Sequence, residues 1–440
     1  MTGNAERDET LVQNGRDAIE LVAHCLCRAQ RFTALIPRSS LPLEAVYCHC
    51  DTCRRLTGAM YTASVPWPDD AAAAVEASSL QRYVVSDAVT TLSCGTCGAC
   101  MFAETRPANN SSSSVPRYAV RTGTLANIDV PGLVNIARHV GIADTRDGGA
   151  VPWFCDANSD SSRPRLWSGQ ENHYGGLGDE LSFETMLEKA SGSGLGAGTA
   201  STDPVPSNSD AIPVKCHCGG VNLLLRRPNA YFAAMPRSEL PWFIDPTNNK
   251  SLAGFDACDS CRISSGSDIF HWTFVLLRHL AFPPSSTGPR PTQTQTWTET
   301  VASSTSPSLT PFPTSSPSLK MAVIHDPSLV GTLTFYASSP DVQRYFCSRC
   351  FASVFYATDS RPELVDLAIG LLHPSKKDGG ARLESLLSWD FGGKMVWRDD
   401  VLGGWREAFV EDVEKAAERW RVRRGLPKIW RRVLKEEGKA

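Results

Sequence analysis

The sequence predicts a mainly β protein made of two repeated metal-binding units and a C-terminal helical extension. Three observations predict it: the cysteines recur in one order in both halves of the chain, short segments rich in β-branched and aromatic residues alternate with turn formers, and helical periodicity is confined to the end. The chain has 440 residues, of which 42% are hydrophobic and 21% charged. This composition is typical of globular proteins and provides enough apolar side chains for two or three domains.

The fifteen cysteines are grouped in a repeated order. A C-x-C pair, a central block and a final C-x-x-C pair occur twice: Cys25 and Cys27, Cys48, Cys50 and Cys53, Cys94 and Cys97, then Cys216 and Cys218, Cys258 and Cys261, Cys347 and Cys350. Segments 47–59 and 255–267 share Cys-Asp-(Thr/Ser)-Cys-Arg, and Tyr83 and Tyr336 each lie eleven residues before the final pair. We interpret this order as a tandem duplication.

The duplication predicts the domain organisation. We expect a first unit at 15–190 with the complete cysteine set and a second, degenerate unit at 211–395. Segment 191–210 is rich in Gly, Ser, Thr and Pro and is typical of a flexible linker. Insertion 283–318 is mostly Pro, Ser and Thr, which cannot bury enough apolar surface to offset chain entropy, so we expect disorder there. Residues 396–440 form the C-terminal extension.

The secondary structure within each unit is expected to be β. Segments 59–67, 117–125 and 271–280 are short, rich in β-branched and aromatic residues, and flanked by turn formers. Segment 405–424 instead predicts a helix that ends at Gly425 and Pro427. Its apolar residues recur at steps of three and four and define one face: Trp405, Phe409, Val413, Ala416 and Trp420.

Charge and hydropathy exclude several classes of protein. The formal net charge is −3, which gives no general attraction to nucleic acid or to anionic membranes. No segment has the roughly 20 consecutive apolar residues that a membrane span needs, and the first twenty residues are polar, so we expect an intracellular, cytoplasmic protein. The basic stretch 419–435 predicts a solvated helix face with core tryptophans, or, as a minor alternative, contact with an acidic protein partner or nucleic acid.

Cysteines without an export signal favour metal binding. Zinc takes four thiolates in closed structural sites, and three protein ligands plus an open position in catalytic ones. The first unit has four cysteines in its outer pairs and three in its central block, which suits one closed and one open site. Disulfides, a thioredoxin-like redox motif, an iron–sulfur cluster and purely structural zinc remain as alternatives.

The first unit resembles a known family. Cys48-His49-Cys50-Asp51-Thr52-Cys53-Arg54, followed by Gly58-Ala59 and flanked by Cys25-Leu26-Cys27 and Cys94-Gly95-Thr96-Cys97-Gly98, is similar to the glutathione-dependent formaldehyde-activating enzymes, a family that includes the centromere protein V type. The resemblance covers nearly all of the first unit and, more weakly, the second. It implies an Mss4-like fold of small antiparallel sheets around zinc.

The resemblance also implies roles for the cysteines. Four of them would hold a structural zinc ion: Cys25, Cys27, Cys94 and Cys97. Cys48, Cys50 and Cys53 would hold a second, catalytic zinc ion with an open position. The implied reaction is carbon–sulfur lyase chemistry on a thiol–aldehyde adduct, with glutathione as co-substrate. The alternative is a non-catalytic, zinc-stabilised interaction protein of the centromere protein V type.

The second unit departs from the family pattern. Asp256 stands where the first cysteine of the central block is expected, so Asp256, Cys258 and Cys261 would form a weaker, harder metal site. Its outer cysteines are expected to keep one structural zinc ion: Cys216, Cys218, Cys347 and Cys350. Two single positions also differ between the units, since Arg28 matches Gly219 and Phe351 matches Gly98.

Several other residues carry expectations. Arg54 and Arg262 follow the central blocks and suit either a substrate carboxylate or an ordinary ion pair. His49 and His217 each lie between two cysteines and are expected to face away from the metal, because alternate side chains of an extended segment point apart. His139 is expected in a strand near the site. Cys100 and Cys155 have no counterpart in the second unit and are expected to be free thiols.

Overall fold

The computed structural model describes residues 17–106, 116–158, 160–170, 176–191, 211–284, 310–375 and 378–438. Most of their regular structure is strand, arranged in four sheets, and this confirms the mainly β prediction. Apart from residue 191, the expected linker 191–210 lies outside the described residues.

The first unit contains a hairpin and a large sheet. The hairpin pairs β1 (Ala18–His24) with β2 (Arg31–Pro37). The large sheet has the order β11-β10-β9-β3-β4-β8-β7-β6-β5. Its strands are β3 (Leu43–Cys48), β4 (Thr62–Pro66), β5 (Gln81–Ser86), β6 (Val89–Ser93), β7 (Cys100–Thr105), β8 (Arg117–Arg121), β9 (Val134–Val140), β10 (Arg165–Trp167) and β11 (Glu180–Leu181).

The second unit also contains a smaller and a larger sheet, of orders β12-β13-β16-β17 and β18-β19-β20-β21-β15-β14-β22. The smaller sheet is built from β12 (Ala211–Lys215), β13 (Asn222–Arg226), β16 (Leu280–Phe282) and β17 (Thr310–Pro311). The larger one is built from β14 (Ser251–Asp256), β15 (Phe270–Leu276), β18 (Leu333–Ser339), β19 (Val342–Cys347), β20 (Ser353–Thr358), β21 (Leu364–Ala368) and β22 (Leu387–Trp389).

The two large sheets share one connection order. Strands β3-β4-β8-β7-β6-β5 of the first unit correspond to β14-β15-β21-β20-β19-β18 of the second. In both sheets these neighbours are antiparallel, whereas the extra strand beside β3 or β14, namely β9 or β22, is parallel. The two large sheets therefore share one strand order, and the tandem duplication stays a prediction.

Helices are short except at the C-terminal end. They are α2 (Asp51–Thr57), α3 (Ala72–Glu76), α4 (Val151–Phe154), α5 (Phe183–Ser191), α6 (Pro228–Ala233), α7 (Asp259–Ser265), α8 (Ser316–His325), α9 (Pro327–Val330), α10 (Arg406–Arg423) and α11 (Trp430–Glu436). The face predicted for 405–424 is buried at all five positions. Among the described helices, none combines the length and the apolar character that crossing a bilayer requires.

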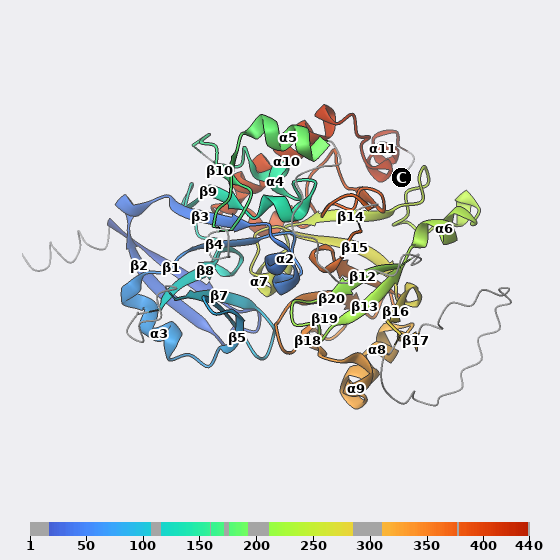
Figure 1. The fold of residues 1–440 in the computed structure, drawn as a ribbon, viewed down its shortest axis with the longest axis horizontal. Helices are drawn as coiled ribbons and strands as arrows, with labels where there is room; N and C mark the ends of the chain where they lie inside the picture. The colour runs from blue at the N-terminus through green and yellow to red at the C-terminus, as the bar shows by residue number, and fades with distance from the viewer. Residues whose placement is uncertain are drawn as a thin grey trace, which may run out of the picture.

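The two units lie side by side, with α2 and α7 between them (Figure 1). Two equivalent hydrogen bonds join them: Gly370 N–H donates to the Gly58 oxygen (2.9 Å), and Gly123 N–H donates to the Gly266 oxygen (3.1 Å). A Cβ on Gly370 would lie 2.1 Å from the Ala59 oxygen, and one on Gly123 would lie 2.4 Å from the Gly266 carbonyl carbon. Glycine therefore allows the two backbones to meet, as at the self-complementary interface of a two-fold dimer.

Helix α10 ties the C-terminal extension to both units. Arg406, at its first turn, is fully buried and donates from Nε to Oδ1 of Asp268 at 2.9 Å. The other carboxylate oxygen of Asp268 accepts from the Tyr47 hydroxyl (3.1 Å) and the Thr122 hydroxyl (2.5 Å) of the first unit. Because a buried charge needs a partner, this network couples the helix to the junction of the two units.

One expectation about the insertion is wrong in part. Residues 310–318 are structured: β17 pairs with β16, and α8 begins at Ser316. Phe312 is buried, and Ser315 and Ser318 form a reciprocal capping box at the helix start. Burial of Phe312 and the helix cap at Ser315 stabilise this segment. Together they offset the loss of chain entropy that its composition led us to expect would keep it disordered. Residues 285–309 of the expected insertion lie outside the described residues.

Candidate metal centres

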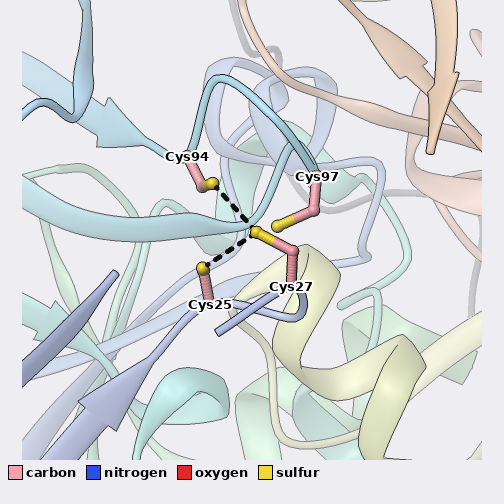
Figure 2. A group of neighbouring side chains, drawn as sticks. All are labelled: Cys25, Cys27, Cys94 and Cys97. Atoms are coloured by element: carbon pink, nitrogen blue, oxygen red, sulfur yellow. Dashed lines mark hydrogen bonds between the residues drawn. The ribbon is translucent and has the colours of Figure 1, made fainter. Parts of the chain in front are cut away.

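The outer cysteines of the first unit meet in one cluster (Figure 2). The Sγ atoms of Cys25, Cys27, Cys94 and Cys97 all lie within 4.8 Å of one another. The turn after β1 supplies the C-x-C pair, and the turn between β6 and β7 supplies the C-x-x-C pair. The second unit repeats this arrangement with Cys216, Cys218, Cys347 and Cys350.

The sulfur spacing suits a tetrahedral metal ion. Zinc–sulfur bonds of about 2.3 Å would place tetrahedral sulfurs about 3.8 Å apart. The Sγ distances are 3.5 Å from Cys25 to Cys27 and 3.6 Å from Cys27 to Cys94, and 3.5 Å from Cys218 to both Cys216 and Cys347. All fifteen cysteines are free thiols, so no disulfide competes for these sulfurs. The donor set and spacing fit a closed zinc site in each unit.

The positions that differ between the units share one backbone conformation. Arg28 and Gly219 follow the two C-x-C pairs with φ of 65° and 70°, and Gly98 and Phe351 follow the two final pairs with φ of 74° and 64°. This left-handed region is favourable only for glycine. The backbone is therefore strained at Arg28 and Phe351. Such strain persists only where the surrounding structure fixes the backbone conformation.

The central cysteines of the first unit form a second cluster. The Sγ atoms of Cys48, Cys50 and Cys53 lie within 4.8 Å of one another, with 3.4 Å between those of Cys48 and Cys50. Cys48 ends β3, Cys50 is the N-cap of α2, and the Cys50 sulfur accepts from the Cys53 N–H at 3.3 Å. The strand-to-helix turn thus gathers three thiols, and no fourth metal-ligating side chain joins them among the described residues.

The three thiols are electrostatically unequal. Hydrogen bonds from the Cys48 and Cys50 thiols hold the pKa of Cys53 well below its ordinary value, helped by the Arg121 charge and a hydrogen bond from Thr62. The bond to Cys48, together with burial, raises the pKa of Cys50. Thr62 and Arg121 come from neighbouring strands β4 and β8, where Ser64 faces Arg121. The cysteine spacing gives no sign of either residue.

The histidines beside the cysteines do not join the clusters. His49 is fully buried, and its Nε2 lies 2.8 Å from Nδ1 of His139 on β9. His217 pairs with the Tyr83 hydroxyl across the unit junction, also at 2.8 Å. His139 therefore contacts His49, and neither ring belongs to the thiol cluster.

The two arginines that follow the central blocks form ion pairs within their helices. Arg54 is buried against Asp51, and Arg262 is buried against Asp259. Arg262 Nη1 also donates to the oxygens of Gly123 (2.6 Å) and Leu125 (3.1 Å). Arg262 thus joins the two units, and a substrate contact of Arg54 stays a prediction.

Two further predictions concern the single cysteines Cys100 and Cys155 and the basic stretch 419–435. Cys100 and Cys155 are buried free thiols, as expected. The basic C-terminal stretch is largely neutralised within the chain, since Arg419 pairs with Asp156, Arg424 with Glu384, Arg432 with Asp390, Lys428 with Glu436 and Arg421 with Glu418. Contact of this stretch with an acidic partner or nucleic acid stays a prediction.

Comparison with known proteins bears directly on the first unit. Residues 20–136 match a family model described as glutathione-dependent formaldehyde-activating enzyme. The chain carries a domain of this family. No curated protein matches the chain.

The formaldehyde-activating enzyme domain contains both cysteine clusters of the first unit. Its bounds include the C-x-C pair, the central block and the final C-x-x-C pair, together with Thr62 and Arg121. The description of the family names glutathione and formaldehyde, and each thiol cluster could hold a metal ion. The second unit lies outside the match, so its membership stays a prediction, as does the centromere protein V likeness.

Proposed function

We propose that the first unit is a zinc-dependent carbon–sulfur lyase acting on a thiol–aldehyde adduct. The observation that carries this proposal is the three-thiol cluster of Cys48, Cys50 and Cys53 inside the formaldehyde-activating enzyme domain. Three protein ligands are typical of catalytic zinc, whereas four thiolates close a structural site. We assign the structural role to the outer cysteines of each unit.

The reaction balances without a redox partner. In the synthetic direction, the thiol sulfur of glutathione forms a bond to the carbonyl carbon of formaldehyde, and the thiol proton ends on the carbonyl oxygen. The reverse direction breaks the same carbon–sulfur bond and returns the proton to sulfur. Zinc, when bound, would lower the pKa of a substrate thiol.

The chain's own residues prepare the site for this chemistry. Hydrogen bonds from its thiol neighbours and the Arg121 charge lower the pKa of Cys53, which favours the thiolate form that zinc binds. The N-cap bond from the Cys53 N–H holds the Cys50 sulfur in place, and His49, which lies between Cys48 and Cys50 in the chain, is buried against His139. Arg121 is held by a 2.8 Å bond from Nη1 to the Ser64 hydroxyl. Its positive charge favours an anionic thiol over a neutral one.

The test is Cys53→Ser in the full chain, with the matched Cys261→Ser change in the second unit as control. We expect Cys53→Ser to lose one zinc ion per chain and to lose exchange of glutathione with formaldehyde, followed by NMR of the adduct. Cys261→Ser should retain that exchange.

Two outcomes would count against the proposal. Unchanged zinc content and unchanged exchange in Cys53→Ser would show that Cys53 is not a ligand of a catalytic zinc ion. Absence of thiol-dependent exchange in the zinc-loaded wild-type chain would instead favour the non-catalytic interaction protein of the centromere protein V type.

A further inference from the structure

The central cluster of the second unit is built differently from that of the first. Asp256, Cys258 and Cys261 place their ligand atoms within 4.8 Å of one another. Each carboxylate oxygen of Asp256 already accepts a hydrogen bond, Oδ1 from the Cys258 N–H at 2.8 Å and Oδ2 from the Cys261 thiol at 3.3 Å. The cluster therefore satisfies its own polar atoms.

A permanent cation stands beside this cluster. Arg344, on β19, donates from Nη1 to the Cys261 sulfur at 3.4 Å. Its Nε donates to the Ser338 hydroxyl at 3.2 Å, and its guanidinium carbon lies 5.1 Å from the centre of the Tyr356 ring. Only 9% of Arg344 is exposed, so these contacts hold the guanidinium in one place. A guanidinium stays protonated in proteins.

The first unit has its nearby cation on another strand: Arg121, on β8, donates from Nη1 to the Ser64 hydroxyl, whereas Arg344 donates to a cluster sulfur. The position equivalent to Arg344 holds an uncharged residue. Arg344 lies opposite Tyr336 in the β18–β19 pair, and Thr91 lies opposite Tyr83 in the β5–β6 pair. Both positions precede the final cysteine pair by three residues. The Thr91 hydroxyl donates to the backbone carbonyl oxygen of Tyr83 at 3.5 Å. An uncharged threonine thus replaces the arginine where the complete three-cysteine set is kept.

We propose that Arg344 takes the place of a metal ion at the second central cluster, which is therefore a metal-free dithiol. The positive charge of Arg344 balances the negative charge of the Asp256, Cys258 and Cys261 cluster, as a zinc ion would. Its hydrogen bond also occupies a lone pair of the Cys261 sulfur. A divalent ion entering the cluster would lie beside a fixed cation in a buried site, where screening is weak. The carboxylate is also a harder ligand than the thiolate it replaces.

This inference concerns the second unit alone and does not rest on the proposed activity of the first. The Arg344 side chain lines a small pocket between the units, beside Cys97 and Trp272. Shortening it would enlarge an existing space, so the variants below are expected to fold.

The experiment measures zinc per chain by native mass spectrometry under reducing conditions, in wild type, Arg344→Thr and Arg344→Lys. Arg344→Thr introduces the residue of the first unit, and Arg344→Lys keeps the charge. We expect about three zinc ions in wild type and in Arg344→Lys, and about four in Arg344→Thr. Four ions in wild type, or no gain in Arg344→Thr, would overturn the proposal.

Alkylation of the native, zinc-loaded chain provides a second measurement that does not depend on counting ions. Cys258 is partly exposed, as is Cys48 in the first unit. We expect iodoacetamide to modify Cys258 in wild type and to spare it in Arg344→Thr. Protection of Cys258 in wild type would overturn this inference, whereas modification of Cys48 would count against the open zinc site of the first unit.

Discussion

The amide of Gly370 donates a hydrogen bond to the carbonyl oxygen of Gly58, 2.9 Å away in the other unit. Gly123 and Gly266 form the equivalent bond in the opposite direction. Gly58 and Gly266 each end the helix that follows a central cysteine block, with φ of 80° and 77°. The motif that gathers the central thiols therefore also forms the contact between the units, so thiol clustering and unit pairing share the same short helices.

Adding a methyl group at this contact should destabilise the chain. Gly123→Ala and Gly370→Ala would each place a Cβ within 2.4 Å of backbone atoms of the opposite unit, and backbone cannot move aside easily. We expect each change to lower the free energy of unfolding by about 1–3 kcal/mol. Gly254→Ala is the control, since a Cβ there meets nothing within 4 Å. Urea titration measures the difference, and equal midpoints for all three variants would contradict the tight contact.

The buried Arg406–Asp268 pair should contribute strongly to the docking of α10. Arg406→Met leaves Asp268 without its ion-pair partner in a fully buried position, which is expected to cost about 3–5 kcal/mol. Removing the exposed ion pairs of the same helix by Lys415→Ala should leave the free energy of unfolding nearly unchanged. Thermal unfolding followed by circular dichroism compares the two. A similar loss of stability in Arg406→Met and Lys415→Ala would show that the buried ion pair contributes no more to stability than the exposed ones.

His271 predicts a pH dependence of stability. It is fully buried among Trp153, Phe255 and Trp389, and burial lowers its pKa to about 3. Below its unfolded pKa of about 6.5, the unfolded chain binds a proton that the folded chain excludes, so stability falls as pH decreases.

Replacing this histidine should remove its part of that loss. Between pH 7.5 and pH 5.5 the free energy of unfolding should fall in both proteins. The fall is expected to be about 1 kcal/mol smaller in His271→Leu than in wild type. His325→Gln, a change at an exposed residue of α8, is the control and should follow wild type. Denaturant titration at both pH values gives the comparison, and parallel curves for wild type and His271→Leu would refute it.

The closed clusters should matter more to stability than to activity. Cys97→Ser removes one of four ligands, and a structural zinc ion contributes its binding energy to folding. We expect this variant to contain one zinc ion less than wild type. Its free energy of unfolding should fall by several kcal/mol, and its melting temperature should fall with it. Cys155→Ser changes a buried thiol outside the clusters and should keep its zinc. Equal melting temperatures and zinc contents would show that Cys97 is not a structural ligand.

The residues of the candidate site were predictable because they are local. A C-x-C or C-x-x-C pair gathers two sulfurs within a single turn, whereas the resemblance to the formaldehyde-activating enzymes implied which pairs share a metal ion. The apolar face of 405–424 was equally visible, because helical periodicity depends only on nearby positions.

Other features depended on composition and were less predictable. Average composition suggested disorder throughout 283–318, yet residues 310–318 pack and pair. There, Phe312 and the Ser315 cap outweigh the composition, and neither effect can be deduced from residue counts.

The sequence by itself determined the mainly β class, the repeated cysteine order, the four groups of possible ligands and the C-terminal helix. Only the tertiary structure decided that Arg344 faces Cys261, that Arg121 and Thr62 act on Cys53, that Tyr83 meets His217, and that Arg406 is buried on Asp268. The physical reason is separation along the chain. These partners meet through strand register and the packing of the two units, and no local spacing records which distant side chains those contacts bring together.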